Sequence, residues 1–296
     1  MPNFINTEQY IEKLFPIGCD FFFEGEKYTV VLCGKPRPSS GECKTDVYIK
    51  GKTAEGQTKE IKISVKQNNA DFLENKMSLS RACEIFGENA SVIIKECINS
   101  IRDSFISDYL VCFEQCGRTE AHTIKLGWKF ELLNKLGGQK SGIIELSEKQ
   151  KYDVFAGINL PNDKKNSRIG TTIIKDSGVA NYIIEFDGNR INQKECLNML
   201  QPIEEYAKMQ TIYFACKALN YRFDKNKWDG PRPLSVYVDW FINSEKLDAQ
   251  LVFDRPLEYN GNHIGENLRI LLKKLKISKF EDLRNKLSSN VKCYPY

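Results

Sequence analysis

The segment from residue 44 to residue 66 constrains the fold most, because its two halves have the composition of paired β-strands. Residues 44–49 are rich in β-branched and aromatic side chains, and a Gly-containing turn at residues 54–57 separates them from residues 60–66. This pattern predicts a β-hairpin. Alternation then sorts the second strand into a polar and an apolar face: Glu60, Lys62, Ser64 and Lys66 against Ile61, Ile63 and Val65.

The polar face of this hairpin brings a carboxylate and an amine within reach of each other. With the turn centred near Gly56, we expect Asp46 to lie opposite Ser64 and Val65, so that its carboxylate converges with the amine of Lys66. A carboxylate can hold Mg²⁺, which polarises a phosphate and lowers the pKa of a bound water. A lysine beside the metal can orient that water and stabilise the developing charge. The pattern is therefore typical of a site that hydrolyses phosphodiesters.

Two other interpretations of the hairpin stay open. Glu60 and Lys62 also place an acid and a lysine on the polar face, about 13 Å from the other pair at roughly 3.3 Å per residue, so one site cannot use both pairs. We favour Ser64 and Lys66, because Asp46 pairs with that end of the strand. The second alternative is an exposed strand with a solvated charged face, which is common in half-buried sheets.

The order of these residues resembles the PD-(D/E)xK nuclease superfamily, specifically the type II restriction endonucleases. The matching positions are Thr45-Asp46-Val47 and Ser64-Val65-Lys66, and the resemblance covers roughly residues 7–109. It implies an α/β fold with a restriction-endonuclease-like mixed sheet flanked by helices and an α+β elaboration toward the C-terminus. It also implies Mg²⁺-dependent cleavage of double-stranded DNA at a short sequence. Enzymes of this kind often act as dimers, so the resemblance suggests a homodimer as well.

One position departs from the family pattern. Ser64 stands where the second acidic metal ligand is expected. We therefore expect Glu42, which flanks the Asp46 strand, to supply the missing carboxylate. The predicted catalytic residues are Asp46, Ser64, Lys66 and Glu42, with Asp46 and Glu42 as the metal ligands.

A sequence-specific nuclease must also contact bases and phosphates, through cationic and amide side chains. Several polar runs of the chain could supply these contacts, the first directly after the catalytic strand and the others in later loops. The candidate DNA-binding residues are Gln67, Asn68, Asn75, Lys76, Lys165, Arg168, Arg222 and Lys227.

The rest of the sequence predicts further elements on either side of a Gly-rich boundary at residues 137–142. We expect a nuclease core in residues 1–140 and a dependent C-terminal part in residues 141–296. Helices are expected at residues 7–15, 71–77, 80–86, 89–109, 119–136, 193–209, 265–275 and 279–287. Strands are expected at residues 27–33, 211–219, 234–241 and 247–253, with a second hairpin formed by residues 171–174 and 181–186.

Composition excludes several other classes. The net charge is only +4, so any basic surface must be local. Cys112 and Cys116 form the only close pair among ten cysteines, and both histidines lie far from any second pair, which disfavours a zinc site. The sequence shows no signal peptide, no apolar span and no Gly-Lys-Ser/Thr phosphate loop, so we expect a cytoplasmic protein without a membrane or a nucleotide cofactor.

Two alternative functions are compatible with the same residues. One is a structure-specific DNA repair or junction nuclease on the same fold. The other is a DNA-binding protein with a degenerate nuclease site, which the missing acid at position 64 suggests.

Overall fold

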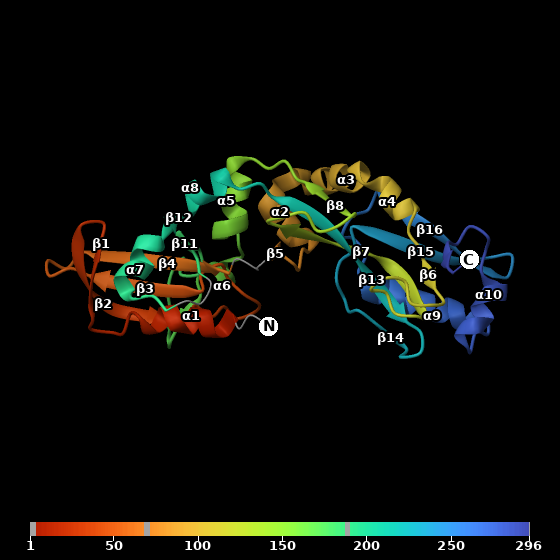
Figure 1. Cartoon of the computed structure of the whole chain (residues 1–296), viewed down its shortest axis with the longest axis horizontal. Coiled ribbons are helices and arrows are strands. Elements are labelled where there is room, and N and C mark those ends of the chain that lie inside the picture. Colours follow the sequence, from red (N-terminus) through yellow and green to blue (C-terminus); the bar gives the residue numbers. More distant parts are fainter. Residues whose placement is uncertain (1–3, 68–71, 187–189, 296) are drawn as a thin grey trace. The chain divides into compact units, whose positions relative to one another are not determined.

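The computed structural model describes residues 4–67, 72–186 and 190–295, and divides the chain into two compact units. The first unit combines Met1–Asp71 with Leu146–Gln210, and the second combines Phe72–Glu145 with Thr211–Tyr296 (Figure 1). Both units are mixed α/β structures. The chain thus leaves the first unit after the hairpin and returns to it later, instead of dividing near residue 140.

The first unit is built on a mixed sheet in the order β1-β2-β3-β4-β11-β12. Neighbouring strands from β1 to β4 run antiparallel, whereas β11 runs parallel to β4, with Tyr182 beside Ile63 and Glu185 beside Lys66. This parallel pairing brings the later segment back into the first unit. The strands are β1 (Asp20–Phe23), β2 (Glu26–Gly34), β3 (Val47–Lys52), β4 (Thr58–Lys66), β11 (Tyr182–Glu185) and β12 (Gln201–Pro202).

One face of this sheet carries the apolar core of the first unit. Helix α1 (Phe4–Lys13) contacts β3, and α7 (Gln193–Met199) contacts β1 and β11. Figure 1 shows α1 running alongside the strands. Ile61 and Ile63, from the predicted apolar face of the hairpin, are fully buried in this core with Ile11 and Phe15. Burying each such side chain contributes about 1.5–3 kcal/mol, which fixes the register of β4 and turns its polar face away from the core.

The elements of the first unit not yet described are α5, α6, β9, β10 and α8. Helix α5 (Glu148–Ala156) begins with a capping box between Ser147 and Gln150, and α8 (Ile203–Met209) packs against it. Between them lie the short helix α6 (Asn162–Lys165) and a small hairpin of β9 (Arg168–Ile169) and β10 (Thr172–Ile173). The predicted pairing of residues 171–174 with 181–186 is wrong, because β10 pairs with β9 and β11 pairs with β4.

The second unit contains another sheet, with a central path β14-β13-β7-β15-β16. These strands are β7 (Thr123–Leu133), β13 (Tyr213–Arg222), β14 (Lys227–Trp228), β15 (Val236–Asn243) and β16 (Lys246–Val252). The strands β5 (Phe72–Glu74), β6 (Val111–Cys112), β8 (Ser141–Ile143) and β17 (Cys293–Tyr294) pair off this path. The helical segments are α2 (Leu79–Phe86), η1 (Gly87–Asn89), α3 (Ala90–Ser100), α4 (Arg102–Ile106), α9 (Gly261–Lys274), η2 (Phe280–Asp282) and α10 (Leu283–Lys286).

Two predicted helices of the second unit are strands. The segment 119–136 contains β7, whose side chains are buried almost throughout, so its apolar residues do not distinguish a strand from a helix. The segment 71–77 contains β5, which pairs with β7. The predicted long helix at residues 89–109 is present as α3 and α4, which meet at Ile101.

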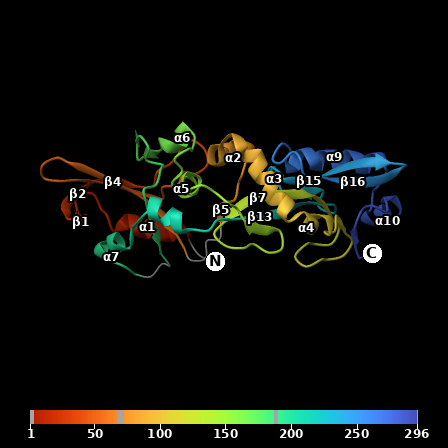
Figure 2. The ribbon, with the colours of Figure 1, turned by 90° about the horizontal axis from the view of Figure 1, so that it is seen from above.

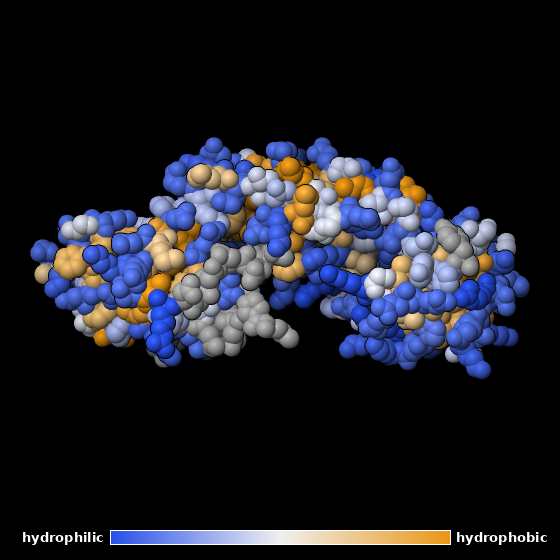
Figure 3. All heavy atoms as spheres, viewed as in Figure 1, coloured by the Kyte–Doolittle hydropathy of each residue, from blue (hydrophilic) through white to orange (hydrophobic). Residues whose placement is uncertain are grey.

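The surface is mainly hydrophilic. Figure 3 shows blue residues over most of the face in view, with apolar residues in smaller areas between them. Figure 2 shows helix α3 and α4 following each other along the sheet of the second unit. Within the described part of the chain, every helix is too short or too polar to cross a bilayer.

Candidate active site

The β3–β4 hairpin has the register that its sequence predicts. Val47 lies opposite Ile63, and the amide of Asp46 donates a 2.8 Å hydrogen bond to the carbonyl of Ile63. Continuing the register by one residue places Asp46 opposite Ser64. The Asp46 carboxylate then accepts a 2.8 Å hydrogen bond from the amide of Val65. Both the backbone and the side chain of Asp46 therefore form hydrogen bonds with the end of β4.

Lys66 is the last residue of β4 and lies on the same face as Ser64. Ser64 is buried with 2% exposure, whereas Lys66 is half-buried. The positive charge of Lys66 acts on the Asp46 carboxyl and favours its ionised form. The structure therefore brings together three of the residues expected at the site, Asp46, Ser64 and Lys66.

Helix α1 supplies a second carboxylate that the sequence did not indicate. Glu8 lies on α1, forms an ion pair with Lys35, and is close enough to Asp46 for its negative charge to act on that carboxyl. The sequence predicted this helix, but not that Glu8 would lie near the start of β3. In the structure, Thr7, the residue directly before Glu8, is buried. The sequence alone does not distinguish Glu8 from the other acid of this helix, Glu12.

Glu42, the carboxylate expected to compensate for Ser64, lies elsewhere. It is exposed in the loop before β3, and its charge acts on Lys35. Glu8 is the acid whose charge acts on Asp46. The loop is anchored at another point, where Ser39 donates a 3.1 Å hydrogen bond to Asp163. The structure thus places Glu8, rather than Glu42, within electrostatic reach of Asp46, because α1 packs against β3.

The environment of Asp46 shifts its ionisation toward neutral pH. Burial, with a smaller contribution from the charge of Glu8, raises the pKa of the Asp46 carboxyl to about 6. The Val65 amide and the charges of Lys66 and Lys35 act in the opposite direction, toward a lower pKa. A carboxyl that loses its proton near neutral pH is ionised at the pH where the protein works and can then bind a cation.

The alternative pair on β4 has structural partners. Glu60 forms a 3.4 Å ion pair with Lys50 on β3, and the amine of Lys62 donates a 3.1 Å hydrogen bond to the carbonyl of Asp176. Burial lowers the pKa of Lys62. Glu60 faces Lys50, four residues along β3 from Asp46, and the carboxylate whose charge acts on Asp46 is Glu8, not Glu60.

The donor set of the site fits one Mg²⁺ ion. Within residues 4–67, 72–186 and 190–295, no group of three His, Cys, Asp or Glu side chains is arranged to hold a metal. Mg²⁺ does not require such a cage, because it keeps several waters and binds through one or two carboxylates and phosphate oxygens. Asp46 and Glu8 are the residues that could hold the ion.

A basic surface of the first unit is attached directly to the Asp46 segment. It consists of the exposed or half-exposed side chains of Arg37, Lys164, Lys165, Arg168 and Lys175. Arg37 and Arg168 exchange backbone hydrogen bonds of 2.8 and 3.0 Å, and Gly178 links the two segments by accepting from Lys44 and donating to Lys165. These bonds hold the basic surface and the start of β3 in one rigid arrangement.

The other candidate DNA contacts are distributed over both units. The Gln67 amide donates a 2.7 Å hydrogen bond to Thr7 on α1, and Asn68 lies outside the described residues. In the second unit, Arg222 forms ion pairs with Asp229 and Glu120. Three further candidates, all exposed, also belong to the second unit: Asn75, Lys76 and Lys227.

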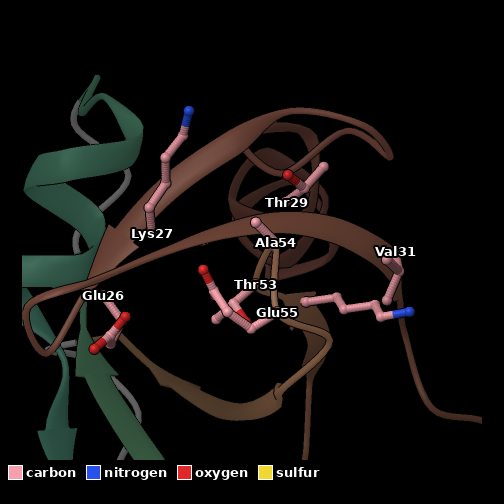
Figure 4. Close-up of a pocket in the computed structure, with 8 residues that line it drawn as sticks. Glu26, Lys27, Thr29, Val31, Thr53, Ala54 and Glu55 are labelled. Atoms are coloured by element: carbon pink, nitrogen blue, oxygen red, sulfur yellow. The ribbon is translucent and has the colours of Figure 1, made fainter.

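A hollow of about 580 Å³ lies at the opposite end of the hairpin from Asp46 (Figure 4). Its lining combines acids, lysines and small side chains from β2 and from the turn after β3, including Glu26, Lys27, Thr53 and Glu55. Lys27 is paired with Asp20 at 2.8 Å. None of the residues that line this hollow belongs to the predicted site around Asp46 and Lys66.

Comparison with known proteins gives no independent assignment. No family model matches the chain, and neither a curated protein nor a solved structure matches it. The function must therefore be argued from the geometry of the site.

Proposed function

We propose that this protein is a Mg²⁺-dependent nuclease that cleaves double-stranded DNA, with a sheet of the restriction-endonuclease type in its first unit. The observation that carries the proposal is the convergence at one end of the β3–β4 hairpin: Asp46 bonded to the Val65 amide, Lys66 at the end of β4, and Glu8 from α1. The mixed order of the sheet, an antiparallel β2-β3-β4 meander with β11 parallel to β4, supports it.

Each residue has a definite role in this proposal. Asp46 and Glu8 would hold the ion, which when bound would supply a Lewis acid for the scissile phosphate and lower the pKa of a bound water. Lys66 orients the attacking water and stabilises the negative charge that develops on the phosphate. Ser64, buried beside them, can donate a hydrogen bond but brings no charge. The basic surface around Arg37 and Arg168 binds the phosphate backbone next to the site.

Within this class we propose a type II restriction endonuclease that acts in the cytoplasm as a homodimer. Sequence recognition would use the basic surface of the first unit and the polar loops of the second. The alternative of a DNA-binding protein with a degenerate site is favoured by one observation, the uncharged Ser64 at the position of a metal ligand. A repair or junction nuclease remains a proposal on the same fold, distinguished by a preference for branched duplexes.

Matched lysine variants test both the reaction and the assignment of the site. The purified protein is incubated with Mg²⁺ and diverse unmodified duplex DNA, together with its Lys66→Ala and Lys62→Ala variants. We expect cleavage by the wild type and by Lys62→Ala, and a loss of about 100-fold or more in Lys66→Ala, because only Lys66 lies beside Asp46. Full activity in Lys66→Ala with none in Lys62→Ala would transfer the site to the Glu60 pair. DNA binding without any cleavage would instead identify a degenerate site.

A further inference from the structure

The chain places a cation of its own among the carboxylates of the site. Lys35 follows the last residue of β2 directly, and Gly34 pairs with Tyr48, so the strand register carries Lys35 toward the start of β3, where Asp46 lies. The amine of Lys35 forms an ion pair with the Glu8 carboxylate, whose side chain is 19% exposed. Lys35 thus joins α1 and the end of β2 at the point where β3 begins.

The charges of the four side chains Glu8, Asp46, Lys35 and Lys66 add up to zero. Glu8 and Asp46 supply two negative charges, and Lys35 and Lys66 supply two positive charges. One divalent ion adds two positive charges, which the phosphodiester and the attacking hydroxide, with one negative charge each, can balance. A second ion would add two more beside two lysines, and no group of three acidic side chains in the described residues is arranged to hold a metal; Glu42, whose charge also acts on Lys35, is exposed. Electrostatics therefore oppose a second metal ion at this site.

We propose that the ammonium of Lys35 is a fixed cation that takes the place of a second metal ion, so that the site binds one divalent ion per chain. This inference rests on the proposed nuclease function and specifies its metal requirement. Lys35 exchanges no proton in this role: it contributes positive charge near the phosphate. Although burial opposes its charge, the bond to Glu8 and the charges of Glu8 and Asp46 raise the pKa of Lys35.

A purely structural role for the Lys35–Glu8 pair leads to a different result. If the pair only fastens α1 to β2, removing the Lys35 amine would release Glu8 and weaken metal binding. If Lys35 is a fixed cation, removing it takes away a charge that repels the metal ion. Asp46 and Glu8 should then bind the ion more tightly. The metal affinity therefore moves in opposite directions under the two roles.

Manganese binding tests the inference without reference to activity. Mn²⁺ prefers the same oxygen ligands as Mg²⁺, and its free concentration can be followed by electron paramagnetic resonance. The proteins compared are the wild type, Lys35→Met, Lys35→Arg and the control Lys27→Met. Lys27 is a matched control because it lies on β2, the strand that ends directly before Lys35, and is likewise paired with a carboxylate, Asp20; it is about 26 Å away at roughly 3.3 Å per residue.

We expect one Mn²⁺ per chain in the wild type, in Lys35→Arg and in Lys27→Met, with similar affinity. Lys35→Met should bind Mn²⁺ about tenfold more tightly or take up a second ion; the expected factor is below the full Coulomb value because Lys35 is 44% exposed. Two ions per wild-type chain, no ion at all, or weaker or unchanged binding in Lys35→Met would overturn the inference.

If Lys35→Met does not fold, the number of Mn²⁺ ions bound per wild-type chain still tests the inference, because two ions per chain would overturn it. The outcome is also separable from that of the proposed function. A wild type that cleaves DNA but binds two ions refutes the role of Lys35 alone. A wild type that binds one ion and cleaves no DNA refutes the nuclease proposal and leaves the ion count standing.

Discussion

The burial of Asp46 should reduce the stability of the first unit at neutral pH, and the substitution Asp46→Asn should restore it. The pKa of this carboxyl rises from 3.8 to about 6 in the folded protein. The folded state therefore holds the proton more tightly than the unfolded state does. The stability that this proton provides is complete below about pH 3.8 and is lost as the pH rises through 6.

The magnitude follows from the shift. The difference between 6 and 3.8 is about 2.2 units, and each unit corresponds to about 1.36 kcal/mol, so ionised Asp46 costs about 3 kcal/mol of unfolding free energy above pH 6. Asparagine can keep the hydrogen bond from the Val65 amide without the charge. We expect Asp46→Asn to stabilise the first unit by about 1–3 kcal/mol at pH 8 and by much less at pH 4.

Urea unfolding without metal, at pH 4 and pH 8, measures this effect. Trp128, Trp228 and Trp240 all belong to the second unit, so tryptophan fluorescence follows that unit while circular dichroism follows both. The stabilisation should appear in circular dichroism and leave the fluorescence midpoint unchanged. An Asn variant that is less stable at pH 8, or a gain that does not depend on pH, would refute the argument that burial sets the pKa of Asp46.

Three further outcomes are expected. Glu8→Gln should lower Mg²⁺-dependent cleavage about 100-fold while the control Glu42→Gln changes it little, because Glu8 is the carboxylate beside Asp46; equal losses in a cleavage assay would contradict this. Mg²⁺ titrated by calorimetry should bind about tenfold more weakly at pH 5 than at pH 8, since protons compete for Asp46, and a pH-independent affinity would disprove it. Arg168→Ala should weaken DNA binding and reduce the slope of log affinity against log salt concentration by about 1, whereas the control Lys27→Ala should not. A gel-shift titration at several salt concentrations measures both. Unchanged binding by Arg168→Ala would show that the basic surface does not contact DNA.

Local patterns predicted the part of the site that lies on adjacent strands. The alternation of residues 60–66 fixed which side chains of β4 share a face, and the turn fixed that Asp46 faces Ser64. Both features depend on residues close in sequence, so no tertiary information was needed. The pairing of β11 with β4, far apart in the chain, gave no comparable signal, and residues 181–186 were placed in the wrong hairpin.

Glu8 was missed for a related reason. Its helix was predicted, but which carboxylate of that helix reaches Asp46 depends on how α1 crosses the sheet. Strand β7 was predicted as a helix because a strand buried on both faces shows no alternation. Sequence patterns therefore located the two strands of the candidate site, whereas the positions of Glu8 and Lys35 depend on how α1 packs against β3.

Cleavage of long, unmodified duplex DNA with mapped fragment ends tests the central claim most directly. With Mg²⁺, the wild type should produce discrete fragments whose ends share a short sequence, and Asp46→Asn should produce none while keeping its fold. The absence of Mg²⁺-dependent cleavage in the wild type, or equal cleavage by Asp46→Asn, would contradict the assignment of the site to Asp46, Glu8 and Lys66.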